Sequence, residues 1–170
     1  MGLQVRVLTE GDASALFRLR RESLLDAPPA FLASPGDDLV SSEDAARELL
    51  MRGGDAAVFG ASTDGLHGMV GLYRDRHLKS AHRIHLWGMF VQPEWRRQGV
   101  GGALLDAAIG HARTLKGVSS LHLSVSDAAP AARRLYEQSG FTVWGVERDA
   151  IRFEGRSFDE YHMAMEMRSD

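Results

Sequence analysis

The sequence predicts a mixed α/β (α+β) fold, with one central sheet of about seven strands flanked by about four helices. Short apolar runs typical of strands recur along the chain, and stretches with apolar residues at helical spacing interrupt them. Two strand-like runs are joined by Thr63-Asp64-Gly65, and an Asp-Gly step favours a hairpin. The 170 residues contain no repeat or linker, so a single domain over residues 1–170 is expected.

The order of the elements follows from apolar spacing and from residues that begin or end helices. Asp12 and a serine at 41 or 42 precede helical runs, Pro130 suits a first helical position, and Gly117 and Gly140 follow helices. The first half is predicted to contain a strand at 3–9, a helix at 13–24, a proline-rich loop at 25–42, a helix ending near 52, and strands at 56–62, 67–75 and 83–91. The second half is predicted to contain a helix at 100–116, a strand at 119–125, a short helix from 130, and strands at 141–148 and 157–168.

Composition excludes several classes of protein. A formal net charge of −3 argues against nucleic-acid binding through a strongly basic surface. The absence of cysteine excludes disulfides, cysteine-ligated metals and a cysteine nucleophile. The sequence has no apolar run of about 18 residues and no apolar signal region at its start, so a cytoplasmic protein is expected. His82 and His85 would face opposite sides of a strand, so they and His77 are not expected to bind a metal.

The stretch from Val91 to Leu105 (VQPEWRRQGVGGALL) carries the most chemical information. A strand ends there, a basic turn follows, and a helix begins among glycines. The first amides of a helix have no partner within it, and the helix dipole adds roughly half a positive charge at that end. Glycine lets an anion approach the backbone, and Arg96 and Arg97 add positive charge. The segment is therefore predicted to bind a phosphate or pyrophosphate.

Three phosphate-binding patterns can be compared with this turn. A Walker loop needs Lys-Ser or Lys-Thr after its last glycine, where this chain has Ala103-Leu104. The dinucleotide fingerprint needs a longer glycine spacing and an acid about 20 residues on, and the region of Ser119-Ser120 offers none. The third pattern, Arg/Gln-x-x-Gly-x-Gly/Ala between a strand and a helix, fits residues 96–101. The spacing therefore opposes binding of ATP or NAD.

Three further features accompany the turn: Val91-Gln92-Pro93 before it, the segment 135–141 (LYEQSGF) after it, and the ending 158–163 (FDEYHM). With these features the chain resembles the GCN5-related N-acetyltransferase (GNAT) superfamily over nearly its whole length. The turn alone is moderately specific, and together with LYEQSGF the signal is strong. The alternative is a glycine-rich helix start without a ligand. The resemblance implies a fold of the acyl-CoA N-acyltransferase type, with a mostly antiparallel sheet, and acetyl-CoA as co-substrate.

The resemblance also implies where acetyl-CoA binds. The backbone at the end of the strand before the turn would pair with the pantetheine arm like an added strand, and the amides of the turn would hold the pyrophosphate. The cofactor-binding residues implied in this way are Met89, Phe90, Val91, Arg96, Arg97, Gln98, Gly99, Val100, Gly101, Gly102, Ala129, Ala132 and Tyr136. Relatives often have an asparagine where this chain has Ala129, so the side-chain contact of that asparagine is lost unless Ser126 or Asp127 replaces it.

Acetyl transfer requires a neutral amine and a proton for the leaving thiolate. Tyr136 matches the tyrosine that the family often uses as the acid; the alternative is a tyrosine packed against Leu135 and Phe141. His85 lies eleven residues before Arg96, where histone-acetylating relatives have a glutamate base and arylalkylamine-acetylating relatives a histidine. Histidine suits proton acceptance near neutrality, so His85 is the candidate base. An ordered water chain, or a histidine with a structural role, is the alternative.

The acceptor site is less defined by the sequence. In this fold the segment between the first two helices, here 26–38, usually covers the acceptor pocket, and Phe31 offers an apolar wall there. Trp87 shares a strand face with His85, which makes it a second candidate, although packing in the core is the alternative. Glu160 on the last strand is a candidate for meeting a cationic acceptor, unless it is solvated. Acids in the covering segment and the net negative charge favour a cationic amine.

The predicted function is transfer of the acetyl group of acetyl-CoA to a primary amine of a small molecule or peptide, by direct attack in a ternary complex and without a metal. A non-catalytic acyl-CoA-binding or sensing module on the same fold is the alternative. No nucleic-acid or membrane partner is expected. Homodimers are common in the family, and Trp144 or the alternation of Met163, Met165 and Met167 offers an interface, unless these residues are buried within the sheet.

Overall fold

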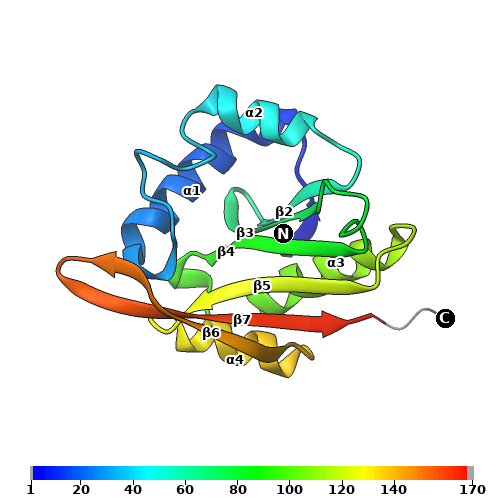
Figure 1. Cartoon of the computed structure of the whole chain (residues 1–170). Helices are drawn as coiled ribbons and strands as arrows, with labels where there is room; N and C mark the ends of the chain where they lie inside the picture. The colour runs from blue at the N-terminus through cyan, green and yellow to red at the C-terminus, as the bar shows by residue number, and fades with distance from the viewer. Residues whose placement is uncertain (1, 168–170) are drawn as a thin grey trace.

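The computed structural model describes residues 2–167, which form one seven-stranded sheet with helices on both faces (Figure 1). The strand order is β1-β2-β3-β4-β5-β7-β6, and only β4 and β5 pair in parallel. The strands are β1 (Gln4–Val7), β2 (Ala56–Ser62), β3 (Leu66–Arg74), β4 (Arg83–Val91), β5 (Ser120–Ser126), β6 (Thr142–Phe153) and β7 (Arg156–Glu166). The helices are α1 (Ala13–Asp26), α2 (Glu43–Met51), α3 (Val100–Thr114) and α4 (Pro130–Gln138), with short 3₁₀ turns η1 (Glu10–Asp12), η2 (Pro28–Ala30) and η3 (Pro93–Trp95). None of the helices within residues 2–167 is long and apolar enough to span a membrane.

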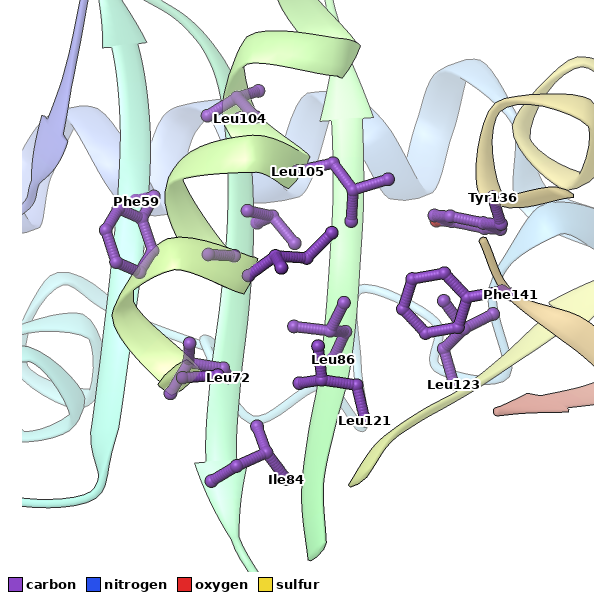
Figure 2. Close-up of a cluster of buried hydrophobic side chains, with 14 of the residues drawn as sticks. Phe59, Leu72, Ile84, Leu86, Leu104, Leu105, Leu121, Leu123, Tyr136 and Phe141 are labelled. Atoms are coloured by element: carbon purple, nitrogen blue, oxygen red, sulfur yellow. The ribbon is translucent and has the colours of Figure 1, made fainter. Parts of the chain in front are cut away.

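Helices α1 and α2 cover one face of the sheet, and α3 and α4 cover the other (Figure 1). Each face has its own buried core. On α3, Leu104 and Ala108 are one helical turn apart and fully buried, and they meet apolar residues of β2 to β5 such as Leu72 and Leu121 (Figure 2). On the other face, Leu16 and its neighbours on α1 pack against α2 and the sheet. The sheet is therefore apolar on both faces at β2, β3 and the second half of β4.

The predicted mixed sheet and its order of elements are confirmed, and the predicted strands 56–62 and 83–91 coincide with β2 and β4. The main difference is the last hairpin, because β6 continues to Phe153 instead of ending at 148. Asp149 has a φ of 56°, and the register with β7 shifts nearby. The polar residues at this bulge break the apolar alternation, which is why the sequence suggested an earlier end. Residue 168, the last of the predicted final strand, lies outside the described residues.

Strands β4 and β5 separate soon after they begin to pair. Their parallel pairing covers three residue pairs, from Arg83 with Ser120 to His85 with His122. Further along β4, Gly88 adopts a φ of 67° at a bulge that shifts the register with β3. Glycine suits this left-handed conformation, and a bulge bends the strand that contains it. Within the described chain, the second half of β4 therefore has no strand partner on the side of β5.

The apolar residues of the last two strands divide between core and surface. Met163 and Met167 are buried, and Met165 packs against the same core. Burial within the sheet therefore accounts for the methionine alternation. Trp144 is 66% exposed on β6, which is an edge strand.

Candidate functional site

The glycine-rich turn lies between the end of β4 and the start of α3. Arg97 and Gly99 have φ values of 59° and 80°, which turn the chain into the helix. The first backbone bond at this end runs from the Ala103 N–H to the Gly99 carbonyl, at 3.0 Å. The preceding N–H groups, from Gln98–Gly102, make no hydrogen bond to residues 2–167. A Cβ atom added at Gly99 or Gly102 would meet nothing within 4 Å, so the turn is open to a ligand.

The polar side chains of the turn differ in how they are held. Arg96 pairs with Asp26 at the end of α1, with 2.6 Å between Nη2 and Oδ2. Gln98 donates from Nε2 to the Glu94 carbonyl at 2.7 Å, within the turn itself. Arg97 is exposed and forms no ion pair with any residue that the structure describes. Arg96 and Gln98 therefore brace the turn, and Arg97 adds an uncompensated positive charge.

The unpartnered edge of β4 contains the residues predicted to pair with the pantetheine arm. Met89 and Val91 pack against the core under α3, whereas Phe90 points to the other face and is buried there. The Val91 carbonyl already accepts a hydrogen bond of 2.8 Å from Arg96 Nε. Of the backbone polar groups along this edge, the Val91 carbonyl is thus already engaged in a hydrogen bond.

Tyr136 lies on α4 and is 7% exposed. Its ring points from α4 toward β4 and meets Phe141 edge to face, with 6.0 Å between the ring centroids (Figure 2). Its hydroxyl makes no hydrogen bond to the described residues. Burial raises the pKa of Tyr136 well above its ordinary value, so the hydroxyl stays protonated. Tyr136 is therefore both a core residue and a potential donor.

The start of α4 lacks a side-chain cap, as expected for Ala129. Ser126, a candidate replacement for the missing asparagine, is buried, and its Oγ accepts from the Ala128 N–H at 3.2 Å. Asp127 donates its N–H to the Asp159 carbonyl of β7. Ser126 is therefore engaged within its own turn. Ala132 packs against the core under α3 and α4.

A cavity of about 640 Å³ lies beneath the segment that joins α1 to α2. The strands β3 to β7 form its floor, and the predicted residues Phe31, His85, Trp87 and Glu160 all line it. Tyr136 does not line the cavity, because α4 covers the opposite face of the sheet. Helices α3 and α4 cover the other face of the sheet (Figure 1). The opening where β4 and β5 stop pairing therefore has the cavity on one side and these helices on the other.

His85 stands at the wall of the cavity where β4 and β5 part. Its ring stacks on Tyr73 of β3, with 5.1 Å between centroids and 18° between planes. Its Nε2 atom lies 3.1 Å from Oδ1 of Asp75, and the ring of His122 is 5.6 Å away. Sequence reasoning missed Tyr73 and Asp75, because their proximity depends on the register of the β3–β4 hairpin.

Another part of the cavity wall is Arg20, which a buried ion pair with Asp38 holds in place. Arg20 donates from Nη2 and Nε to the two carboxylate oxygens, at 2.7 and 3.0 Å. The two side chains are 7% and 3% exposed. The guanidinium also lies over the rings of Phe31 and Trp87, at 5.0 and 5.6 Å from their centroids. This cluster fixes the covering segment to α1 and β4.

The pair accounts for one of the acids in the covering segment that were expected to attract a cationic amine, whereas its neighbour Asp37 lines the cavity. Burial acts to raise the pKa of Asp38, but the contacts with Arg20 outweigh it, so the pKa is lowered and the carboxylate is charged. Asp38 therefore neutralises Arg20. A signal was present in the sequence, since Arg20 lies four residues after Leu16 and four before Leu24, on the apolar face of α1.

Glu160 lies on β7 beside His162 at the far wall of the cavity. Burial is the main reason that the pKa of Glu160 is raised. His162 is fixed on both sides, since Nδ1 lies 2.9 Å from Ser124 Oγ and Nε2 lies 3.0 Å from Glu147 Oε2. Glu147, Glu160 and His162 each bring one potential ligand atom within 4.8 Å of the others. Glu160 is the member of this group that is left without an ion pair among residues 2–167.

The sequence is similar to known acetyltransferases. The model of the Acetyltransferase (GNAT) family matches residues 17–141. A mycothiol acetyltransferase of Propionibacterium freudenreichii subsp. shermanii is 31% identical over 118 residues, which are 67% of this chain and 37% of that protein. The chain thus spans about a third of the length of that curated relative.

The fold is also found in solved structures. A GNAT-family acetyltransferase from Streptococcus pneumoniae has a TM-score of 0.88 at 22% identity, over 98% of this chain and 100% of that one. The putative acetyltransferase yncA from Salmonella typhimurium, solved with its cofactor acetyl-CoA, has a TM-score of 0.82 at 18% identity, over 100% and 96% of the two chains. At these identities the likeness concerns the fold.

Proposed function

Because the chain belongs to the GNAT acetyltransferase family, we propose that it transfers the acetyl group of acetyl-CoA to a primary amine of a small molecule or peptide, by direct attack in a ternary complex. The proposal rests on the opening between β4 and β5, where the two strands stop pairing after His85 and His122. This opening has the unpartnered amides of the glycine-rich turn near one end and the cavity on one face. A ligand with an anionic pyrophosphate, an amide-bearing arm and a terminal thioester matches this arrangement of turn, strand edge and cavity.

The cofactor would bind along the opening. The amides of Gln98–Gly102 would hold the pyrophosphate, because they lack partners and lie at the positive end of α3. Arg97 would add charge, while Arg96 keeps the turn braced. The pantetheine arm would pair with the edge of β4 around Met89 and Phe90, as an added strand does. The thioester would then lie beside the bulge at Gly88.

The acceptor would enter from the cavity. Phe31 and Trp87 would provide an apolar wall, already ordered by their contact with Arg20. Glu160 would attract a cationic amine, since its carboxylate has no ion pair in the described chain and is half-buried. The acceptor is therefore proposed to be a cationic amine that carries an apolar group.

The reaction requires two proton transfers. A lysine-like amine is neutral in only about 1 molecule in 2,500 at pH 7, so its first proton would pass to His85 and then to solvent. The neutral nitrogen would attack the thioester carbon, and the C–S bond would break with its electron pair left on sulfur. Tyr136 would protonate the thiolate and recover a proton from the nitrogen of the adduct. The products are an N-acetyl amide, free CoA and one proton released to solvent.

Replacing Tyr136 with phenylalanine is expected to lower turnover by about 100-fold, the lower range of general acid catalysis, and to leave acetyl-CoA affinity nearly unchanged. The fold should persist, because the hydroxyl makes no hydrogen bond to the described residues and the ring is retained in the core. Steady-state assays of thiol release, with calorimetry for affinity, separate the two effects. Unchanged turnover would remove Tyr136 as the acid.

Calorimetric titration with acetyl-CoA tests the function, with ATP and NAD as controls. We expect micromolar binding of acetyl-CoA alone, followed by thiol release when cationic amines are added. A folded protein that binds ATP or NAD instead, or no nucleotide, would contradict the assignment.

A non-catalytic acyl-CoA-binding module on the same fold is the second candidate. The observation that favours it is the start of α4, where Ala129 provides no side-chain contact and Ser126 is engaged locally. Binding of acetyl-CoA without thiol release across a broad panel of amines would favour this module over the enzyme.

A further inference from the structure

The two ring nitrogens of His85 have different surroundings. Nε2 is fully buried and has no hydrogen bond of regular geometry, and the Asp75 carboxylate lies 3.1 Å from it. Nδ1 forms no hydrogen bond within residues 2–167 and is not enclosed, while the residue itself lines the cavity. The side of His85 that faces the proposed acceptor is therefore Nδ1.

The orientation of the ring is fixed by its neighbours. Tyr73 stacks nearly parallel to His85, which prevents the ring from tilting toward β3. The ring of His122 limits it on the side of β5, at 5.6 Å. A half-turn of the ring about Cβ–Cγ would place Cε1 where Nε2 stands and Cδ2 where Nδ1 stands, so the observed orientation is the one that brings Nε2 beside Asp75.

Asp75 is a carboxylate under ordinary conditions. Burial acts to raise its pKa, but the contacts with His85 and Arg83 outweigh it, so the pKa is lowered. A charged carboxylate is only an acceptor, and the nitrogen that faces it must carry the hydrogen. Neutral His85 is then protonated on Nε2 and has its lone pair on Nδ1.

We infer that Asp75 is a positioning residue, which holds His85 in the Nε2–H form so that Nδ1 accepts the proton of the acceptor ammonium. The inference rests on the proposed function. When Nδ1 takes this proton, the N–H bond of the ammonium breaks, its electron pair stays on the amine nitrogen, and the imidazolium that forms lies beside the Asp75 charge. The same carboxylate therefore selects the tautomer and stabilises the protonated base.

The other charged and titratable groups around His85 are compatible with this role. Tyr73 has a pKa raised mainly by burial and stays neutral. His122 has a pKa lowered mainly by burial, with Arg83 and His85 adding to it, and its Nε2 lies 2.9 Å from Ser120 Oγ. Glu166 acts on His122 in the opposite direction. The lowered pKa of His122 favours its neutral form, so His122 does not compete with His85 for the Asp75 carboxylate as a cation.

Nitrogen NMR of the ligand-free protein tests the inference without relying on catalysis. The seven histidines allow assignment of His85 by its loss in His85→Gln. In the wild type, neutral His85 should carry its proton on Nε2. In Asp75→Asn, the Nε2–H form should no longer be favoured, because the side-chain amide offers Nε2 a donor as well as an acceptor. A proton on Nδ1 in the wild type, or an unchanged tautomer preference in the variant, would overturn the inference.

Asp55→Asn is the matched control, because Asp55 forms an ion pair of 3.0 Å with Arg74 near the start of β2 and does not contact His85. It should leave the tautomer of His85 unchanged. The wild-type tautomer decides the inference even if Asp75→Asn does not fold or no acceptor is found, so its failure is distinct from failure of the proposed function.

Discussion

Replacing Gly102 with glutamate is expected to weaken acetyl-CoA binding by about 100-fold, equivalent to about 2.8 kcal/mol, without weakening the fold. A side chain at Gly102 meets open space, so no packing is disturbed. A carboxylate in the first turn of α3 would lie among the amides proposed to hold the pyrophosphate and would repel it. The same carboxylate favours the helix, because the N-terminal end of the dipole attracts negative charge and glycine is a poor helix former.

Gly110→Glu on the same helix provides the control. Gly110 is exposed, and a Cβ atom there also meets nothing within 4 Å, but it lies far along α3 from the turn. Calorimetry should give wild-type affinity for Gly110→Glu and a much weaker affinity for Gly102→Glu, with melting temperatures at or above that of the wild type in both. Equal affinities in the two variants would mean that the turn does not bind the pyrophosphate.

The second large effect concerns the buried ion pair between Arg20 and Asp38. Asp38→Ala is expected to lower the melting temperature by about 10 °C. Losing one partner of a buried ion pair lowers the free energy of unfolding by about 3 kcal/mol, and in a chain of this size each kcal/mol lowers the melting temperature by about 3 °C. Arg20 would be left charged, and its Nη1 is already buried without a partner. The rings of Phe31 and Trp87 would then lie over a guanidinium without its counter-ion.

Asp44→Ala is the control, because Asp44 forms an ion pair of the same length, 2.7 Å, with Arg47 in an exposed position on α2. It should change the free energy of unfolding by less than about 1 kcal/mol. The pKa of Asp38 is lowered in the folded protein, so its contribution is present above the pKa of the unfolded chain, near 4, and is lost as the pH falls through the folded pKa. The difference between Asp38→Ala and the wild type should therefore shrink in acid. Scanning calorimetry at several pH values measures this difference. An equal loss of stability in Asp38→Ala and Asp44→Ala would contradict a structural role for the buried pair.

Local patterns in the sequence predicted the parts of the molecule that depend on neighbours in the chain. The alternation in residues 83–91 predicted β4, and the glycines after Arg97 predicted the turn into α3. The resemblance to GNAT acetyltransferases pointed to the covering segment with Phe31, and strand periodicity pointed to Trp87 and Glu160. All three residues line one cavity. The faces of strands follow from periodicity, and the ends of helices from a few residue types. A single sequence is therefore enough to predict both.

The remaining features depend on contacts between distant segments. The pairing of Arg20 with Asp38 requires the fold of the covering segment, which no periodicity describes. The contact between Asp75 and His85 requires the register of a hairpin whose loop has no short turn signature. The bulge at Gly88, which accompanies the parting of β4 and β5, appears in the sequence only as one glycine within a strand. These contacts are identified only when the three-dimensional structure shows which segments are neighbours.

The early parting of β4 and β5 has a consequence for how the protein avoids aggregation. An open sheet ordinarily has two edges, both at its outside, and each is a template for pairing with another chain. This sheet also has an inner edge along the second half of β4, where no strand pairs on the side of β5 within the described residues. The cavity on one side of it is roofed by the segment that Arg20 and Asp38 hold in place. The ligand-free chain is consequently the form at risk of strand invasion, and loss of that ion pair would endanger solubility as well as the melting temperature.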